Sequence, residues 1–198
     1  MFFTEIPFAI LLSMAAYAIC QVPPDKYPFA FAACAIALIS GFLGQPRGPV
    51  CPLNRVKKFF TSLMNCAPLA LMNIEIFLEA KPIYAAAHRY SIIPLGLDIM
   101  TSQFGDRFDA AICTILKFLN HFLNTGSLIA ISILEKNYKY PFIALSYLMA
   151  QVSLTYGFCA TRARNEQMYV ICVAFFLFAC TKIVGDKDYL DKEYCKVY

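Results

Sequence analysis

The chain is dominated by long apolar runs that are separated by short polar or proline-containing connections. A bilayer core is crossed by a helix of about 20 apolar residues, with roughly 17 to 25 tolerated. Six runs satisfy this requirement: Ile6–Val22, Pro28–Gly44, Phe59–Leu78, Ile112–Leu134, Tyr140–Thr161 and Met168–Val184. The pattern predicts an all-α integral membrane protein, a polytopic bundle of transmembrane helices.

A seventh segment, Pro82–Met100, is long enough to cross a membrane but contains His88, Arg89, Pro94 and Asp98. Such a segment is typical of a broken span, a re-entrant segment or an interfacial helix. The prediction is therefore a bundle of six or seven transmembrane helices. It forms one domain over residues 1–184, followed by a short charged C-terminal tail, residues 185–198.

Composition supports this class and excludes several others. Of the 198 residues, 60% are hydrophobic and 15% are charged, and the mean hydropathy is +0.58, so there is no room for a sizeable soluble domain. The basic residues that give the net charge of +4 are spread over several connections, which argues against a nucleic-acid partner. We expect the partners to be the lipid bilayer and other membrane protein subunits.

Sequence motifs give little support to an enzyme. The chain has no GxSxG, HExxH, phosphate-binding loop or dinucleotide-binding fingerprint. Most of its nine cysteines lie inside apolar runs and none forms a CxxC pair, so we expect packing cysteines and no metal site.

The N-terminal run is expected to be retained as the first span. It is preceded by Glu5 rather than by the basic residues of a signal peptide, and no Arg-rich transit sequence is present. The mitochondrial inner membrane and the endoplasmic reticulum both stay open, with an organellar location preferred.

One face of the fourth run carries polar residues at spacings of three and four, which places them on one side of a helix. This polar stripe consists of Asp109, Cys113, Lys117, Asn120, His121, Asn124 and Ser127. A Lys at the centre of a span costs roughly 2.5–3.5 kcal/mol on insertion scales, so the stripe should face protein or a water-filled cavity. It is either a buried contact between helices or subunits, or the lining of a path for a solute.

The Lys117 ammonium needs a counter-charge if it is buried. Glu75, in the third run, is the preferred candidate, and Asp98 competes with it. Alternatively, Glu75 and Glu79 lie in the headgroup region. A weaker polar stripe in the third run comprises Ser62, Asn65, Cys66 and Asn73.

The two histidines, His88 and His121, lie on different candidate helices. Two neutral imidazoles can hold a b-type haem, which makes haem a remote possibility in a chain for which no cofactor is expected. The run His88–Ser91 resembles the quinone-site segment of succinate dehydrogenase membrane anchors, and the resemblance covers these four residues.

Two further features point to helix packing and to the membrane surface. Ala33, Ala37 and Gly41 form a small-residue face of the kind that allows close contact between helices. A basic loop between the second and third runs is expected to face anionic headgroups on the cytosolic or matrix side. Its cations are Arg47, Arg55, Lys57 and Lys58.

Two functions fit these features. The first is a non-catalytic, multi-pass subunit of a larger membrane protein complex, in which the polar stripe makes subunit contacts. The second is a small channel or transporter in which Asp109, Lys117, His121 and Asn124 line an intramembrane path. A b-haem or quinone-site membrane anchor is a remote third.

Overall fold

The computed structural model describes residues 6–44, 51–104, 110–155 and 162–194, and every regular element in them is helical. The side chains of helical residues 51–54, 102–104, 110–113, 155, 162–163 and 184–194 are not described. The elements are α1 (Ile6–Gln21), α2 (Pro28–Gly44), α3 (Cys51–Ala80), α4 (Pro82–Ala85), the 3-10 helix η2 (Ala86–Ser91), α5 (Ile92–Phe104), α6 (Ala110–Glu135), α7 (Lys139–Thr155) and α8 (Arg162–Tyr194).

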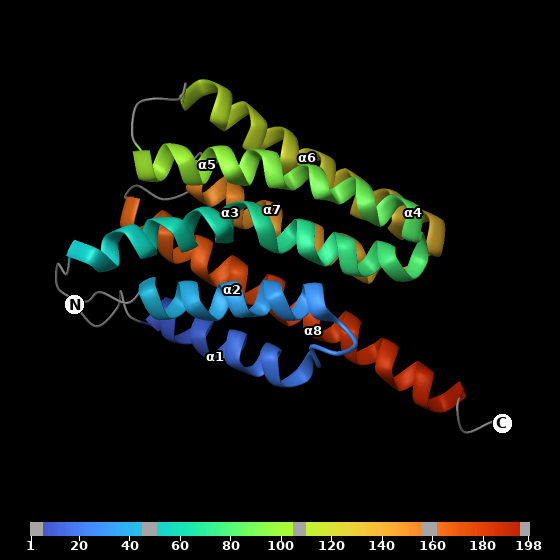
Figure 1. The fold of residues 1–198 in the computed structure, drawn as a ribbon. Helices are drawn as coiled ribbons and strands as arrows, with labels where there is room; N and C mark the ends of the chain where they lie inside the picture. Colours follow the sequence, from blue (N-terminus) through green and yellow to red (C-terminus); the bar gives the residue numbers. More distant parts are fainter. Residues whose placement is uncertain (1–5, 45–50, 105–109, 156–161, 195–198) are drawn as a thin grey trace.

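The long helices lie side by side and run in alternating directions (Figure 1). Helices α1, α3, α6 and α8 run one way, and α2, α5 and α7 run the other. Helix α3 packs against α2, α5 and α6, while α8 packs against α1 and α7. The segment from α4 to α5 returns along α3 and is interrupted by the 3-10 turn η2.

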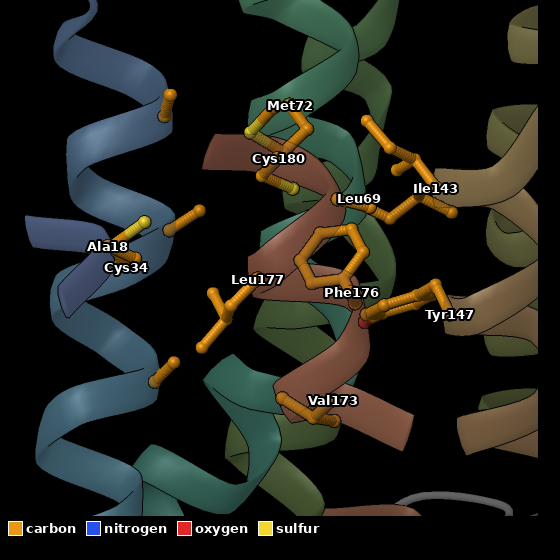
Figure 2. Close-up of a cluster of buried hydrophobic side chains, with 14 of the residues drawn as sticks. Ala18, Cys34, Leu69, Met72, Ile143, Tyr147, Val173, Phe176, Leu177 and Cys180 are labelled. Carbon is orange, nitrogen blue, oxygen red and sulfur yellow. The ribbon is translucent and has the colours of Figure 1, made fainter. Parts of the chain in front are cut away.

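The core is centred on α8 (Figure 2). Phe176 points toward Tyr147 of α7, with ring centroids 5.1 Å apart, and Leu177 lies on the side of α8 that faces Ala18 and Cys34. Phe176, Leu177 and Tyr147 are all fully buried. The small Ala18 lets α1 approach α8 closely.

Helix α2 packs through its small-residue face. Ala33, Ala37 and Gly41 are buried. A Cβ atom built on Gly41 would lie 3.5 Å from the Leu11 side chain of α1, which is ordinary van der Waals contact. The face therefore has room for a methyl group at residue 41 and for little more.

Pro68 lies inside α3, close to a contact with α7. Proline has no N–H, so the carbonyl of Met64, four residues earlier, loses its helical hydrogen bond. The Tyr147 hydroxyl donates to this carbonyl oxygen at 3.1 Å and is 2.8 Å from that of Asn65. A side chain of α7 thus satisfies a backbone acceptor that α3 leaves open.

The turn between α6 and α7 is closed by local hydrogen bonds. Lys136, just after α6, has a positive φ of 54°, a conformation that favours glycine. The N–H of Asn137 donates to the Ser132 carbonyl at 3.1 Å, and the Ser132 hydroxyl donates to the Asn137 carbonyl at 2.8 Å. These bonds hold α6 and α7 antiparallel.

All six expected apolar runs lie largely within helices, but several expected boundaries were wrong. Arg55, Lys57 and Lys58, expected in a loop, belong to the first turns of α3, which begins at Cys51. Helix α8 begins at Arg162 and continues to Tyr194, so most of the expected tail is helical. The N–H groups of these residues are satisfied within the helices, which charged residues do not prevent.

Membrane-spanning character rests on length and composition. Among the described residues, two helical stretches are long and apolar enough to cross a membrane, Arg55–Ala80 and Arg164–Ile183, while α1 and α2 are shorter apolar helices. Buried core helices of soluble proteins meet the same criterion, so these stretches are weak evidence for membrane association. The six or seven expected spans are not confirmed by this criterion.

Candidate functional site

The polar stripe of α6 lies against α3, η2 and α5. Asn120 and Asn124 are buried, and Asn124 has no exposed surface. Ser127 is partly buried on the same face. Neighbouring positions on the opposite face, such as Phe118 and Phe122, are exposed. Helix α6 therefore turns its amides inward and its large apolar side chains outward.

Asn124 is the centre of a hydrogen-bonded group that we call the asparagine network: Asn73, His88, Ser91, Asn120, Asn124 and Ser127. Its Nδ2, with two hydrogens to donate, lies 2.8 Å from the Asn120 carbonyl, 3.0 Å from Asn120 Oδ1 and 3.3 Å from Ser91 Oγ. A backbone carbonyl can only accept, so this contact fixes the orientation of the Asn124 amide.

The oxygen end of the Asn124 amide contacts both α3 and η2. Asn124 Oδ1 accepts from Asn73 Nδ2 at 2.8 Å and lies 3.0 Å from His88 Nδ1. Because Oδ1 is an acceptor, His88 Nδ1 must carry the hydrogen. The His88 ring also packs against Phe77, with ring centroids 4.7 Å apart. One side chain of α6 thus ties together α3 and the 3-10 turn.

Asn73 and Asn120 extend the network to the backbone. Asn73 Nδ2 lies 2.9 Å from the Asn124 carbonyl and 3.3 Å from Ser127 Oγ, and Asn120 Nδ2 donates to the Cys66 carbonyl of α3 at 3.4 Å. Asn73 Oδ1 is buried and has no hydrogen-bond partner among the described residues. Helix α6 is therefore fixed to α3 at two levels, about one helical turn apart.

Lys117 forms a salt bridge with Asp98 of α5. The side chain of Asp98 is 10% exposed and that of Lys117 is 31% exposed, so the pair lies at the edge of the α5–α6 contact. Of the two counter-charges considered from the sequence, the structure brings Asp98, and not the preferred Glu75, to Lys117 Nζ.

Glu75 lies instead at the N-terminus of α2. Its Oε2 accepts from the N–H groups of Phe29 at 2.7 Å and Ala30 at 2.9 Å, in the first turn of a helix that begins at Pro28. These N–H groups have no partner within the helix, and the helix dipole favours an anion there. Glu75 therefore joins α3 to α2.

The two histidines contact different neighbours. His121 packs against the Tyr147 ring, with centroids 5.7 Å apart, and its buried Nδ1 has no hydrogen-bond partner among the described residues. Within the described chain no three His, Cys, Asp or Glu side chains gather as a metal site. Haem ligation by His88 and His121 stays a prediction.

Several expected site residues fall outside the described part. These are Arg47, Asp109 and the side chain of Cys113. Arg55, Lys57 and Lys58 are exposed at the start of α3. Tyr147, which the sequence did not single out, joins α3, α6 and α8. The signal that could have identified it is Pro68, since a proline inside a helix requires a donor from elsewhere.

Comparison with known proteins adds a family assignment. The model of a family described as "Domain of unknown function (DUF4791)" matches residues 24–184. The chain belongs to this DUF4791 family. The match includes the whole asparagine network and both members of the Lys117–Asp98 pair. No curated protein and no solved structure matches the chain significantly.

Proposed function

We propose that the chain is a seven-span membrane protein that serves as a non-catalytic subunit of a larger membrane protein complex. The observation that carries the proposal is the two-sided character of α6. Its inward face holds Asn120 and Asn124, whereas its outward face exposes eight large apolar side chains: Ile115, Phe118, Leu119, Phe122, Leu123, Ile129, Ile133 and Leu134. Soluble proteins rarely expose apolar patches of this extent, whereas a surface in contact with lipid or with another membrane helix requires them.

The same two-sided character explains why α6 is not among the helices whose average hydropathy meets the criterion for a membrane span. Its buried amides lower the average for the helix, but a lipid-facing surface is made only by the outward residues. Exposed Ile92 and Ile93 continue the apolar surface onto α5. We count α4, η2 and α5 together as one interrupted span, because non-helical backbone at membrane depth is tolerated where protein covers it.

Helix lengths and directions are compatible with seven spans. The 26 residues of α6 extend about 39 Å, more than the roughly 30 Å of a bilayer core. With 17 residues, α2 stands at the lower limit of about 17, and α1, with 16, is one residue shorter. The alternating directions of successive segments place their connections at opposite ends of the bundle, as in a chain that threads a membrane repeatedly (Figure 1).

A subunit role is favoured over transport because the polar stripe is engaged in contacts between helices. Asn73, Asn120 and Asn124 hydrogen-bond to one another or to nearby backbone. The end of the bundle between α1, α2, α3, α7 and α8 holds a cavity, and these asparagines do not line it. The apolar outer surface of α6 is then free to contact either lipid or a helix of a partner protein.

Native co-purification in mild detergent tests the proposal. We expect stoichiometric membrane-protein partners to be retained with the parent chain and lost with Phe118→Ala/Phe122→Ala, which removes the stacked pair on the outer face of α6. Phe175→Ala, a substitution of an exposed Phe on α8, is the matched control. A monomeric chain without partners would overturn the subunit role.

The second candidate is a small channel or transporter, and the partial exposure of Lys117 favours it. A cation that lines a path should set the selectivity for anions. Flux of a small anion into liposomes that carry the purified chain alone, abolished by Lys117→Met with the fold intact, would establish transport and replace the subunit role.

A further inference from the structure

A pocket lies at one end of the bundle, where the first halves of α1, α3 and α8 meet the last turns of α2 and α7. We call it the end pocket. Its volume is about 390 Å³, within the roughly 300–1,000 Å³ range of small-molecule sites. Apolar walls are provided by Phe8, Leu43, Met64, Leu154 and Val170. None of these residues belongs to the asparagine network.

Polar groups lie among these walls. Asn65 Oδ1 accepts from the Tyr169 hydroxyl at 3.0 Å, and the Asn65 carbonyl accepts from Gln151 Nε2 at 3.4 Å and lies 2.8 Å from the Tyr147 hydroxyl. The contact with Tyr169 orients the Asn65 side chain. Because Oδ1 is the acceptor for Tyr169, the other end of the Asn65 amide is Nδ2, which has two hydrogens to donate. Asn65 and Tyr169 both line the end pocket.

Charge at the pocket comes from Lys57 and Glu166, both exposed on its wall. The neighbouring Lys58 and Arg55, on the first turns of α3, are exposed as well, so the α3 side of this end is basic. Glu166, on α8, would repel an anionic head, so a ligand with an apolar chain and an anionic head fits with its head on the α3 side, where Asn65 Nδ2 and Lys57 Nζ can donate hydrogen bonds to it.

We infer that the end pocket binds the acyl chain of an anionic amphiphile, with the anionic head held by Lys57 and Asn65. Two sources share this chemistry, a free fatty acid and an anionic phospholipid. The inference rests on the membrane location in the proposed function but does not require a partner protein. Acyl chains suit the walls because the transfer of CH₂ groups from water to apolar surroundings is favourable.

Binding is tested on the full chain with two probes. The first is a photoactivatable fatty acid, and the second is phosphatidylglycerol in nanodiscs, measured by native mass spectrometry against phosphatidylcholine. We expect cross-links to residues of the end pocket with the first probe, or retained phosphatidylglycerol with the second. Whichever probe binds identifies the source.

Matched variants place the ligand in the pocket. Lys57→Gln should weaken binding of the anionic probe about fivefold, the value expected for one cation worth about 1 kcal/mol, whereas Lys58→Gln should change it less than twofold. Leu154→Phe, which fills the pocket, should abolish binding, and Leu145→Phe, on the exposed face of the same helix, should not. Asn65→Asp keeps an acceptor for Tyr169 but replaces the donor, and should weaken binding of the anionic probes.

The outcomes separate this inference from the proposed function. Membrane flotation and carbonate extraction of the same preparations report whether the chain is integral. An integral chain that binds neither probe, or binds with equal affinity in Leu154→Phe and Leu145→Phe, would overturn the end-pocket site and leave the proposed function standing. A chain extracted by carbonate would overturn the membrane location on which both depend.

Discussion

The Lys117–Asp98 salt bridge offers the sharpest test of whether the polar stripe is structural. Loss of one partner from a fully buried ion pair costs about 3–5 kcal/mol, because the remaining charge stays buried without compensation. Exposed pairs are worth only about 0–1 kcal/mol. With Asp98 10% exposed and Lys117 31% exposed, this pair lies between the two limits. We expect Lys117→Met to lower the free energy of unfolding by about 1–3 kcal/mol.

A double-mutant cycle separates the pair from other effects of substitution. Lys117→Met, Asp98→Asn and the double variant should show a favourable coupling of about 1 kcal/mol or more, since the double variant leaves no charge unpaired. The buried thiols of Cys34, Cys66 and Cys180 provide the assay, because a thiol-reactive dye reports their exposure during unfolding in detergent.

The control for this cycle is Lys58→Met, which removes an exposed lysine from the first turns of α3 and should leave unfolding unchanged. The reasoning is refuted if Lys117→Met and Lys58→Met unfold alike, or if the coupling energy is zero. In that case the Lys117–Asp98 salt bridge would make no net contribution to the free energy of unfolding.

Three further variants test individual helix contacts in the same unfolding assay. Glu75→Gln should cost about 1 kcal/mol, because it removes the negative charge at the N-terminus of α2 but keeps an acceptor; an unchanged midpoint would argue against the cap. Gly41→Leu should cost about 1–3 kcal/mol through overpacking against Leu11, while Gly41→Ala should be tolerated; equal stability of both would mean that α1 can move away. Lys136→Gly should stabilise the chain by roughly 1 kcal/mol, because Lys136 adopts a positive φ, and a loss of stability would contradict this.

Much of the helix layout could be predicted from the sequence, because apolar runs and prolines carry that information locally. The second run, Pro28–Gly44, coincides with α2, and the first ends one residue after α1. Proline at the first position of a helix marks a start that the sequence displays directly. The extension of α8 to Tyr194 was missed, since charged residues end an apolar run without ending a helix.

Contacts between helices could not be predicted in the same way. The spacing of Asn120 and Asn124 correctly placed them on one face, but which partner each amide meets depends on how α3, η2 and α5 dock. Lys117 illustrates the difficulty, because both Glu75 and Asp98 carry the right charge. In the structure Glu75 lies at the N-terminus of α2 and Asp98 pairs with Lys117. No pattern in the local sequence reveals which of the two acids meets the lysine.

The proline in α3 also has a consequence for the order in which the chain is made. Ribosomes complete α3 long before they reach Tyr147, so the Met64 carbonyl emerges without the hydroxyl that later satisfies it. In a chain inserted helix by helix, an unsatisfied carbonyl in lipid costs several kcal/mol, and α3 would be retained near the insertion machinery or a chaperone until α7 arrives. Ribosome-bound intermediates that end before α7 should therefore cross-link to such factors, and Pro68→Ala should shorten that contact. Equal cross-linking of the parent chain and Pro68→Ala would show that the Met64 carbonyl does not determine how long α3 stays near these factors.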